Sequence, residues 1–192
     1  MPQPRTTTRL PYLFFMLTLT VFNNAYTADP SYCLLSNPQQ DYTLLAGMIA
    51  DHHQHASFLA TVDSLDAKAL QAAVTPKKQT LLMLAIIGYN ATKVEHTQNS
   101  YFKIIETLIN EYKKYEYPAT KRDFAGNTAL HYAPNILIAA LILSTGLKAI
   151  INIENDHAET ACDFAVHNGN NTLADFLKDN GAKTSRSCCT IS

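Results

Sequence analysis

Residues 123–133 read DFAGNTALHYA, and two other stretches of the chain carry the same arrangement of residue types. Each contains a hexad with Thr first, an apolar residue third and fifth, and Ala sixth. The hexads begin at Thr80, Thr128 and Thr160, so successive copies start 48 and 32 residues apart. Recurrence on this scale is typical of chains built from stacked helical units.

The hexad predicts the start of a helix. Thr can cap the free amides of a first helical turn, and the small Ala lets a neighbouring helix approach closely. An apolar second segment follows each hexad, at residues 104–109, 136–143 and 173–177. Gly181 then suits the left-handed residue that ends a helix. Each unit therefore reads as helix, turn, helix and loop, and the units must stack because none can bury its apolar face alone.

The stretch at 123–133 resembles the start of an ankyrin repeat, a unit of about 33 residues with the pattern T-P-L-H-x-A. The resemblance covers residues 77–183. It implies that Gly126 forms the turn before the first helix and that His131 hydrogen-bonds between neighbouring repeats. The predicted fold is an all-α ankyrin-repeat solenoid with three clear repeats and a degenerate first one. The expected second-helix core of that first repeat is Phe58, Leu59, Val62 and Leu65.

The chain departs from the ankyrin pattern in four places. About 11 extra residues lie between the helices of the first clear unit, within 87–102, and a smaller insertion follows at 111–123. Pro134 comes directly after the middle hexad and shortens that unit. Ala158 occupies the position of the usual loop glycine in the last unit. These changes leave the stacking intact but shift the borders of the repeats.

The N-terminal residues have the order of a secretory signal. Arg5 and Arg9 precede an apolar run at 10–22, and small residues follow at Ala25 and Ala28. The run is too short to cross a bilayer as a helix. We expect residues 1–28 to direct export; the alternative is an apolar helix docked on the fold. The other expected divisions are a degenerate capping repeat at 29–73, repeats at 74–183 and a tail at 184–192.

The chain ends in the C-a-a-X pattern of prenylated proteins, Cys189-Thr190-Ile191-Ser192. Cys188 could carry a second lipid, and two lipids are what hold a protein stably on a membrane. The tail predicts peripheral membrane attachment. Together with the export signal it fits a bacterial effector delivered to the membrane of a host cell. The alternative is an exported protein whose tail is unmodified.

Composition limits the function classes. Of the 192 residues, 47% are hydrophobic and 16% charged, which favours a folded core over disorder. The net charge of −1 offers no basic surplus for a run of phosphates, so we expect no nucleic-acid partner. Residues 51–55, DHHQH, are either a metal-ligand cluster or a solvated turn, and we favour the turn. We expect no metal, no cofactor and no catalysis; a small metal- or thiol-dependent enzyme using the 51–55 cluster or Cys162 is the alternative.

The expected function is binding of an unidentified protein. The stretch 111–117, EYKKYEY, is either a contact patch or the packed end of a helix. The resemblance to ankyrin repeats implies partner contacts on the loop tips and on the first helices. The candidate contact residues are Lys77, Lys78, Lys121, Arg122, Phe124, Asn155 and His157. The residues expected to hold the repeats together are Thr80, Thr128, His131, Thr160, Gly126 and Gly181.

Overall fold

The structure is a computed structural model, and it describes residues 38–62, 75–117 and 119–184. All of them belong to one unit of the chain, Asn37–Ser192. The described residues are mostly helical and contain no strand, which confirms the all-α prediction. None of the described helices has both the length and the hydropathy of a membrane span.

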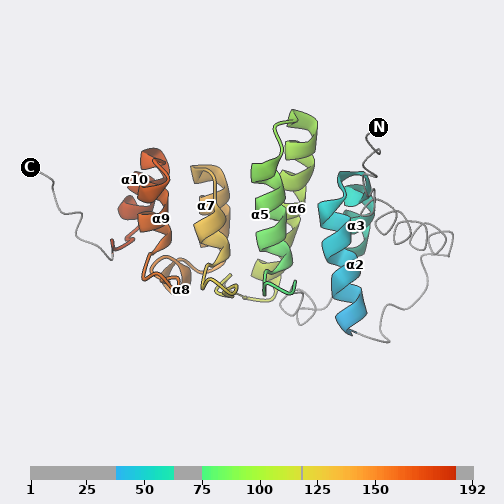
Figure 1. The fold of residues 1–192 in the computed structure, drawn as a ribbon, viewed down its shortest axis with the longest axis horizontal. Coiled ribbons are helices and arrows are strands. Elements are labelled where there is room, and N and C mark those ends of the chain that lie inside the picture. The colour runs from blue at the N-terminus through green and yellow to red at the C-terminus, as the bar shows by residue number, and fades with distance from the viewer. Residues whose placement is uncertain (1–37, 63–74, 118, 185–192) are drawn as a thin grey trace, which may run out of the picture. The chain divides into compact units, whose positions relative to one another are not determined.

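The helices follow one another in pairs (Figure 1). In chain order they are α2 (Pro38–Ala50), the 3-10 helix η1 (His52–Gln54), α3 (His55–Val62), α5 (Leu81–Ala91), α6 (Glu95–Lys114), the 3-10 helix η2 (Ala129–Tyr132), α7 (Ile136–Leu143), α8 (Leu147–Ile150), α9 (Ala161–His167) and α10 (Asn171–Asp179). The pairs are α2–α3, α5–α6, η2–α7 and α9–α10, and the two members of each pair are in contact.

Contacts between pairs arrange these helices in two layers. In the first layer α2 contacts α5, α5 contacts η2, and η2 contacts α9. In the second layer α3 contacts α6, α6 contacts α7, and α7 contacts α10. The core lies between the layers and includes the buried side chains of Phe58, Leu82, Ile105, Ile138 and Leu177. Each helix therefore buries its apolar side chains against the other helix of its pair and against the neighbouring pairs.

The hexads begin helices as their residue types predict. Thr80 precedes α5 and accepts a hydrogen bond from the Met83 N–H at 3.3 Å. Thr160 precedes α9 and accepts from the Asp163 N–H at 3.2 Å. The Asp163 carboxylate accepts in return from the Thr160 N–H at 3.0 Å, which completes a capping box. After α10, Gly181 has the left-handed φ of 94° that a helix end favours.

The extra residues of the first clear unit do not form an inserted loop, which corrects the prediction for 87–102. Helix α5 continues to Ala91 and α6 begins at Glu95, so only 92–94 join them. The addition lengthens α6 to 20 residues. The cause is that 95–114 contains no Pro or Gly and places apolar side chains at helical spacing, with Tyr101, Ile104, Ile105 and Leu108 all buried.

The middle pair is shortened at its first helix. The hexad beginning at Thr128 forms only a four-residue 3-10 helix, η2, where the other hexads start α-helices. Pro134 lacks the N–H that a longer helix would need, so the chain turns there and Asn135 caps α7. The short helix α8 after α7 was not predicted from the sequence.

Candidate protein-binding surface

Three loops of identical design lead into the hexads, at residues 75–80, 123–128 and 155–160. The first residue of each loop is Thr75, Asp123 or Asn155. Its N–H donates to the carbonyl of the fifth residue, at 3.1, 2.9 and 2.8 Å respectively. Its side-chain oxygen accepts from the N–H groups of the third and fifth residues. The same turn is therefore built from three different side chains.

The fourth residue of each loop has a left-handed backbone. The φ angles are 58° at Lys78, 76° at Gly126 and 57° at Ala158. Glycine adopts this conformation without steric strain, whereas the side chains of Lys and Ala crowd the backbone there. The sequence difference noted at Ala158 thus changes the energy of the loop while its conformation is kept.

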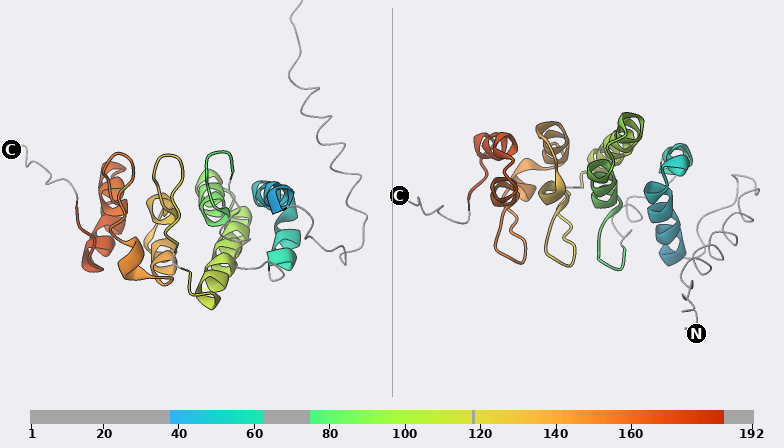
Figure 2. Two further views of the ribbon diagram at one scale, coloured as in Figure 1. Left: turned by 90° about the horizontal axis from the view of Figure 1, so that it is seen from below. Right: turned by 45° about the horizontal axis from the view of Figure 1, so that its top comes forward.

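Backbone hydrogen bonds join the loops to one another. The second residue of each later loop donates to the third residue of the loop before it: Phe124 N to Lys77 O at 3.1 Å, and Asp156 N to Ala125 O at 3.0 Å. The three loops project side by side on one side of the helices in both views of Figure 2 (green, yellow and orange). We call the surface formed by these loops, with the adjoining residues 121 and 122, the loop edge.

His131 connects the middle pair to the last loop. Its Nδ1 accepts from the Thr128 N–H at 3.1 Å, which leaves the proton on Nε2. Nε2 then donates to the carbonyl of Glu159 at 3.1 Å. Burial lowers the pKa of His131, and the hydrogen bond to Glu159 opposes that shift. The neutral imidazole thus links residues 128 and 159, while the equivalent positions of the other hexads hold Met83 and Asp163.

Six of the seven candidate contact residues are exposed on the loop edge: Lys77, Lys78, Lys121, Arg122, Phe124 and His157. Phe124 is 62% exposed, a large fraction for an aromatic residue, and the Lys78 Nζ lies 4.8 Å from its ring centroid. Asn155 differs from these six because it is only 6% exposed. Its side chain binds Asn127 at 3.0 Å and closes its own loop, so its role is structural.

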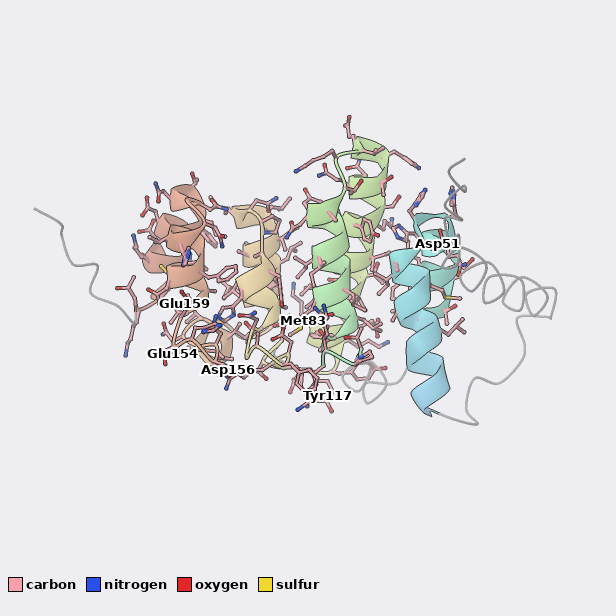
Figure 3. The ribbon with its side chains drawn as sticks, in the orientation of Figure 1. Asp51, Met83, Tyr117, Glu154, Asp156 and Glu159 are labelled. Atoms are coloured by element: carbon pink, nitrogen blue, oxygen red, sulfur yellow. The ribbon has the colours of Figure 1, made fainter. Side chains whose placement is uncertain are left out.

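Charge is unevenly distributed along the loop edge. Arg122 pairs with Asp156 at 2.8 Å and also donates to the Gly126 carbonyl at 2.9 Å. Glu154 and Asp156 lie along the lower margin in Figure 3, so acidic side chains lie just before and within the last loop, which contains no Lys or Arg. The lysines at 77, 78 and 121 lie at the first two loops, and no carboxylate of the described residues pairs with them.

The Tyr/Lys stretch at 111–117 contains the last turn of α6, which ends at Lys114, and the residues that follow it. Tyr112 is buried, and burial raises its pKa to about 12, with a hydrogen bond to Thr80 acting in the opposite direction. Lys113 and Lys114 are exposed, and Lys114 pairs with Glu111 at 3.0 Å. This arrangement matches the packed helix end rather than the contact patch.

The DHHQH segment forms a capped turn. Asp51 precedes η1, and its two carboxylate oxygens accept from the His53 N–H at 3.0 Å and from Gln54 at 3.2 Å. Ligand atoms of Asp51, His52 and His53 lie within 4.8 Å of one another. His55 is not part of a solvated turn, because it is 3% exposed and packs against Tyr101. Its Nε2 binds the Ile49 carbonyl at 3.0 Å.

Cys162 is fully buried, and its Sγ lies 3.6 Å from the carbonyl of Ala174. An apolar, enclosed environment of this kind is that of a structural cysteine rather than of an activated nucleophile. The geometry offers no support for a thiol enzyme based on this residue.

A pocket of about 250 Å³ lies between the middle and last pairs, and sequence analysis missed it. Its lining includes Asn90, Tyr132, Phe164, Asn168 and Asn170. Asn90 donates to the Tyr132 carbonyl and Asn170 to the Pro134 carbonyl, both at 2.9 Å. Pro134 is the sequence feature that indicates this pocket. It ends the first helix of the middle pair early, and the shortened η2 does not fill the space beside α9.

Several predicted features lie outside the described residues. These are the export signal at 1–28, Leu65 of the first unit, and the tail cysteines Cys188 and Cys189. Comparison with known proteins gives no match, either to a protein-family model or to a curated protein sequence.

Proposed function

We propose that the chain is an ankyrin-type repeat stack that binds another protein through its loop edge, without a cofactor and without catalysis. The observation that carries this proposal is the set of backbone hydrogen bonds joining residues 77 to 124 and 125 to 156. These bonds connect equivalent positions of successive loops, as expected where one structural unit repeats. The two layers of helices and the Thr caps that recur before α5 and α9 also support the proposal, since each of these pairs begins in the same way.

A partner would meet a surface that is fixed before binding. Each loop is closed by its first side chain, and neighbouring loops are joined by backbone bonds. A partner therefore does not have to order these loops, which lowers the entropic cost of association. Phe124 offers exposed apolar area at the centre of the edge, and aromatic side chains commonly supply much of the energy of protein interfaces.

The proposal is tested by comparing partners recovered by the wild-type chain and by a K121E/F124A variant. Both residues are exposed, and neither side chain donates to the backbone of the loops. Arg122 is left unchanged because its contacts with Asp156 and Gly126 support the second loop. A K93E/K103E variant is the control, since both lysines are exposed beside or within α6. Partners must be lost from the loop-edge variant and retained by the control; equal recovery by all three proteins contradicts the proposal.

Delivery and membrane attachment are proposals that rest on the two ends of the sequence. The mass of the chain purified from eukaryotic cells tests the tail, because prenylation adds a farnesyl group at Cys189. A C189S variant is the control. An unmodified wild-type mass would reject lipid anchoring but would leave protein binding by the loop edge untouched.

A further inference from the structure

The first two loops carry positive charge that the fold does not use. Lys77, Lys78 and Lys121 are exposed, and no carboxylate among the described residues pairs with them. Asp123, the carboxylate that is closest in sequence, is turned inward: its Oδ1 accepts from the N–H groups of Ala125 and Asn127, and its other oxygen accepts from Tyr132. It therefore does not lie between the lysines to neutralise them.

Apolar surface lies within this charged group. Phe124 is 62% exposed, and its N–H bond to the Lys77 carbonyl fixes its backbone against the first loop. The Lys78 ammonium lies 4.8 Å from the centroid of the Phe124 ring, within the range of a cation–π contact. Lys121 precedes Phe124 by three residues, and Lys77 is joined to Phe124 through the backbone. One exposed aromatic ring thus lies on the same loop edge as three lysines, and Lys78 contacts it.

The adjoining loop has the opposite charge. Asp156 already binds Arg122 at 2.8 Å, and Glu154 is exposed beside it. A long polyanion lying along the whole loop edge would meet these carboxylates and be repelled by them. A nucleic acid needs a longer unbroken run of cations than three lysines for tight binding. The favoured anion is therefore short and does not extend to the third loop.

We propose that the loop edge binds an acidic, partly apolar peptide segment of a protein partner. Its carboxylates pair with Lys77, Lys78 and Lys121, and an apolar side chain between them covers Phe124. Opposite charges of this kind accelerate association and make it sensitive to salt. The Phe124 ring, once the peptide covers it, supplies affinity that salt affects little. The preference of the loop edge for acidic peptides rests on the proposed function, because both concern a partner bound at the loop edge.

The test begins with a selection of random 12-residue peptides displayed on phage, using the full 192-residue chain as bait. A selected peptide is synthesised with a fluorescent label, and its affinity is measured for the wild type, K77E/K121E, F124A and K93E/K103E. The two double variants change the net charge equally, but only K77E/K121E changes the loop edge. Selected peptides should be rich in Asp and Glu. K77E/K121E should bind at least about tenfold more weakly, and the control should stay within about twofold.

The other outcomes separate the two proposals. Peptides without acidic residues that still lose affinity with F124A would overturn the acid preference and leave the loop edge as the binding surface. Peptides that bind K77E/K121E and F124A as well as the wild type would overturn both. Failure to enrich any peptide also counts against both. If no acidic peptide is selected but the chain binds a 20-nucleotide oligothymidylate or phosphatidylserine vesicles, the ligand is another anion. That result would overturn the proposal of an acidic peptide.

Discussion

Replacement of Gly126 by Ala tests whether the second loop is held by its neighbour. Gly126 has a φ of 76°, and the left-handed conformation costs a residue with a Cβ about 1–2 kcal/mol. An added Cβ would also lie 2.6 Å from the backbone nitrogen of Asp156 and would collide with the side chains of Arg122 and Asp156. The third loop must then move away, which weakens the bond from Asp156 N to Ala125 O.

The expected destabilisation combines these two effects with a smaller opposing one. Alanine has less conformational freedom than glycine in the unfolded chain, which offsets part of the backbone strain and leaves about 0.5–1 kcal/mol. Loss of the bond between the loops adds about 1 kcal/mol, so the free energy of unfolding of G126A should fall by about 1.5–2 kcal/mol. Gly169 supplies a matched control, because its φ is 72° but nothing lies within 4 Å of an added Cβ. G169A should therefore lose only about 0.5–1 kcal/mol.

The third loop allows the reverse substitution. Ala158 occupies the position equivalent to Gly126 with a φ of 57°, so A158G removes strain. Glycine also gives the unfolded chain more conformational freedom, which offsets part of the gain and leaves a stabilisation of about 0.5–1 kcal/mol.

Urea unfolding followed by far-ultraviolet circular dichroism measures all three variants on the full chain. The midpoints should rank A158G above wild type, wild type above G169A, and G169A above G126A. Equal midpoints for G126A and G169A would refute the claim that the second and third loops support each other. A lower midpoint for A158G would refute the assignment of strain to the third loop.

The remaining predictions concern the contacts between pairs and the buried thiol. The pKa of His131 in the folded chain lies below the ordinary value of 6.5, so the unfolded chain takes up the proton first as the pH falls. The stability that neutral His131 contributes is therefore present above pH 6.5 and is lost below that pH. Urea midpoints measured between pH 5 and pH 8 should show this loss in the wild type and not in H131A. N90A should lower the free energy of unfolding by about 1 kcal/mol in urea titrations, because it removes one side-chain bond to the middle pair. N170A should lower it by about 2 kcal/mol, because it removes the bond to Pro134 and also the cap of α10; no change in N90A would exclude its bond as a link between pairs. In a chain whose other three cysteines are replaced by Ser, Cys162 should react with a thiol reagent only after denaturation, and fast labelling of the folded protein would contradict its burial.

Short sequence patterns predicted the starts of three helices and the extent of α7, because residues close in sequence determine these features. The Thr hexads located the starts of α5, η2 and α9, and the apolar run at 136–143 coincides with α7. The capping oxygen and the apolar periodicity act within a few residues, so both can be recognised without a structure.

Features that depend on contacts distant in sequence could not be predicted in this way. His55 was taken for a solvated residue because polar neighbours surround it in sequence, but Tyr101 covers its ring. Asn155 looked like a loop-tip contact, yet its amide binds Asn127 from the preceding loop. The length of α6 was misjudged because a count against the repeat period shows that residues were added and does not show whether they extend a helix or form a loop.

The shortness of η2 has a consequence for how the chain loses its structure. On one layer only four residues of 3-10 helix stand between α5 and α9, whereas on the other layer α7 bridges α6 and α10 with eight residues. In linear arrays each unit gains stability from its immediate neighbours. The middle pair is therefore the junction at which we expect the array to lose its structure first.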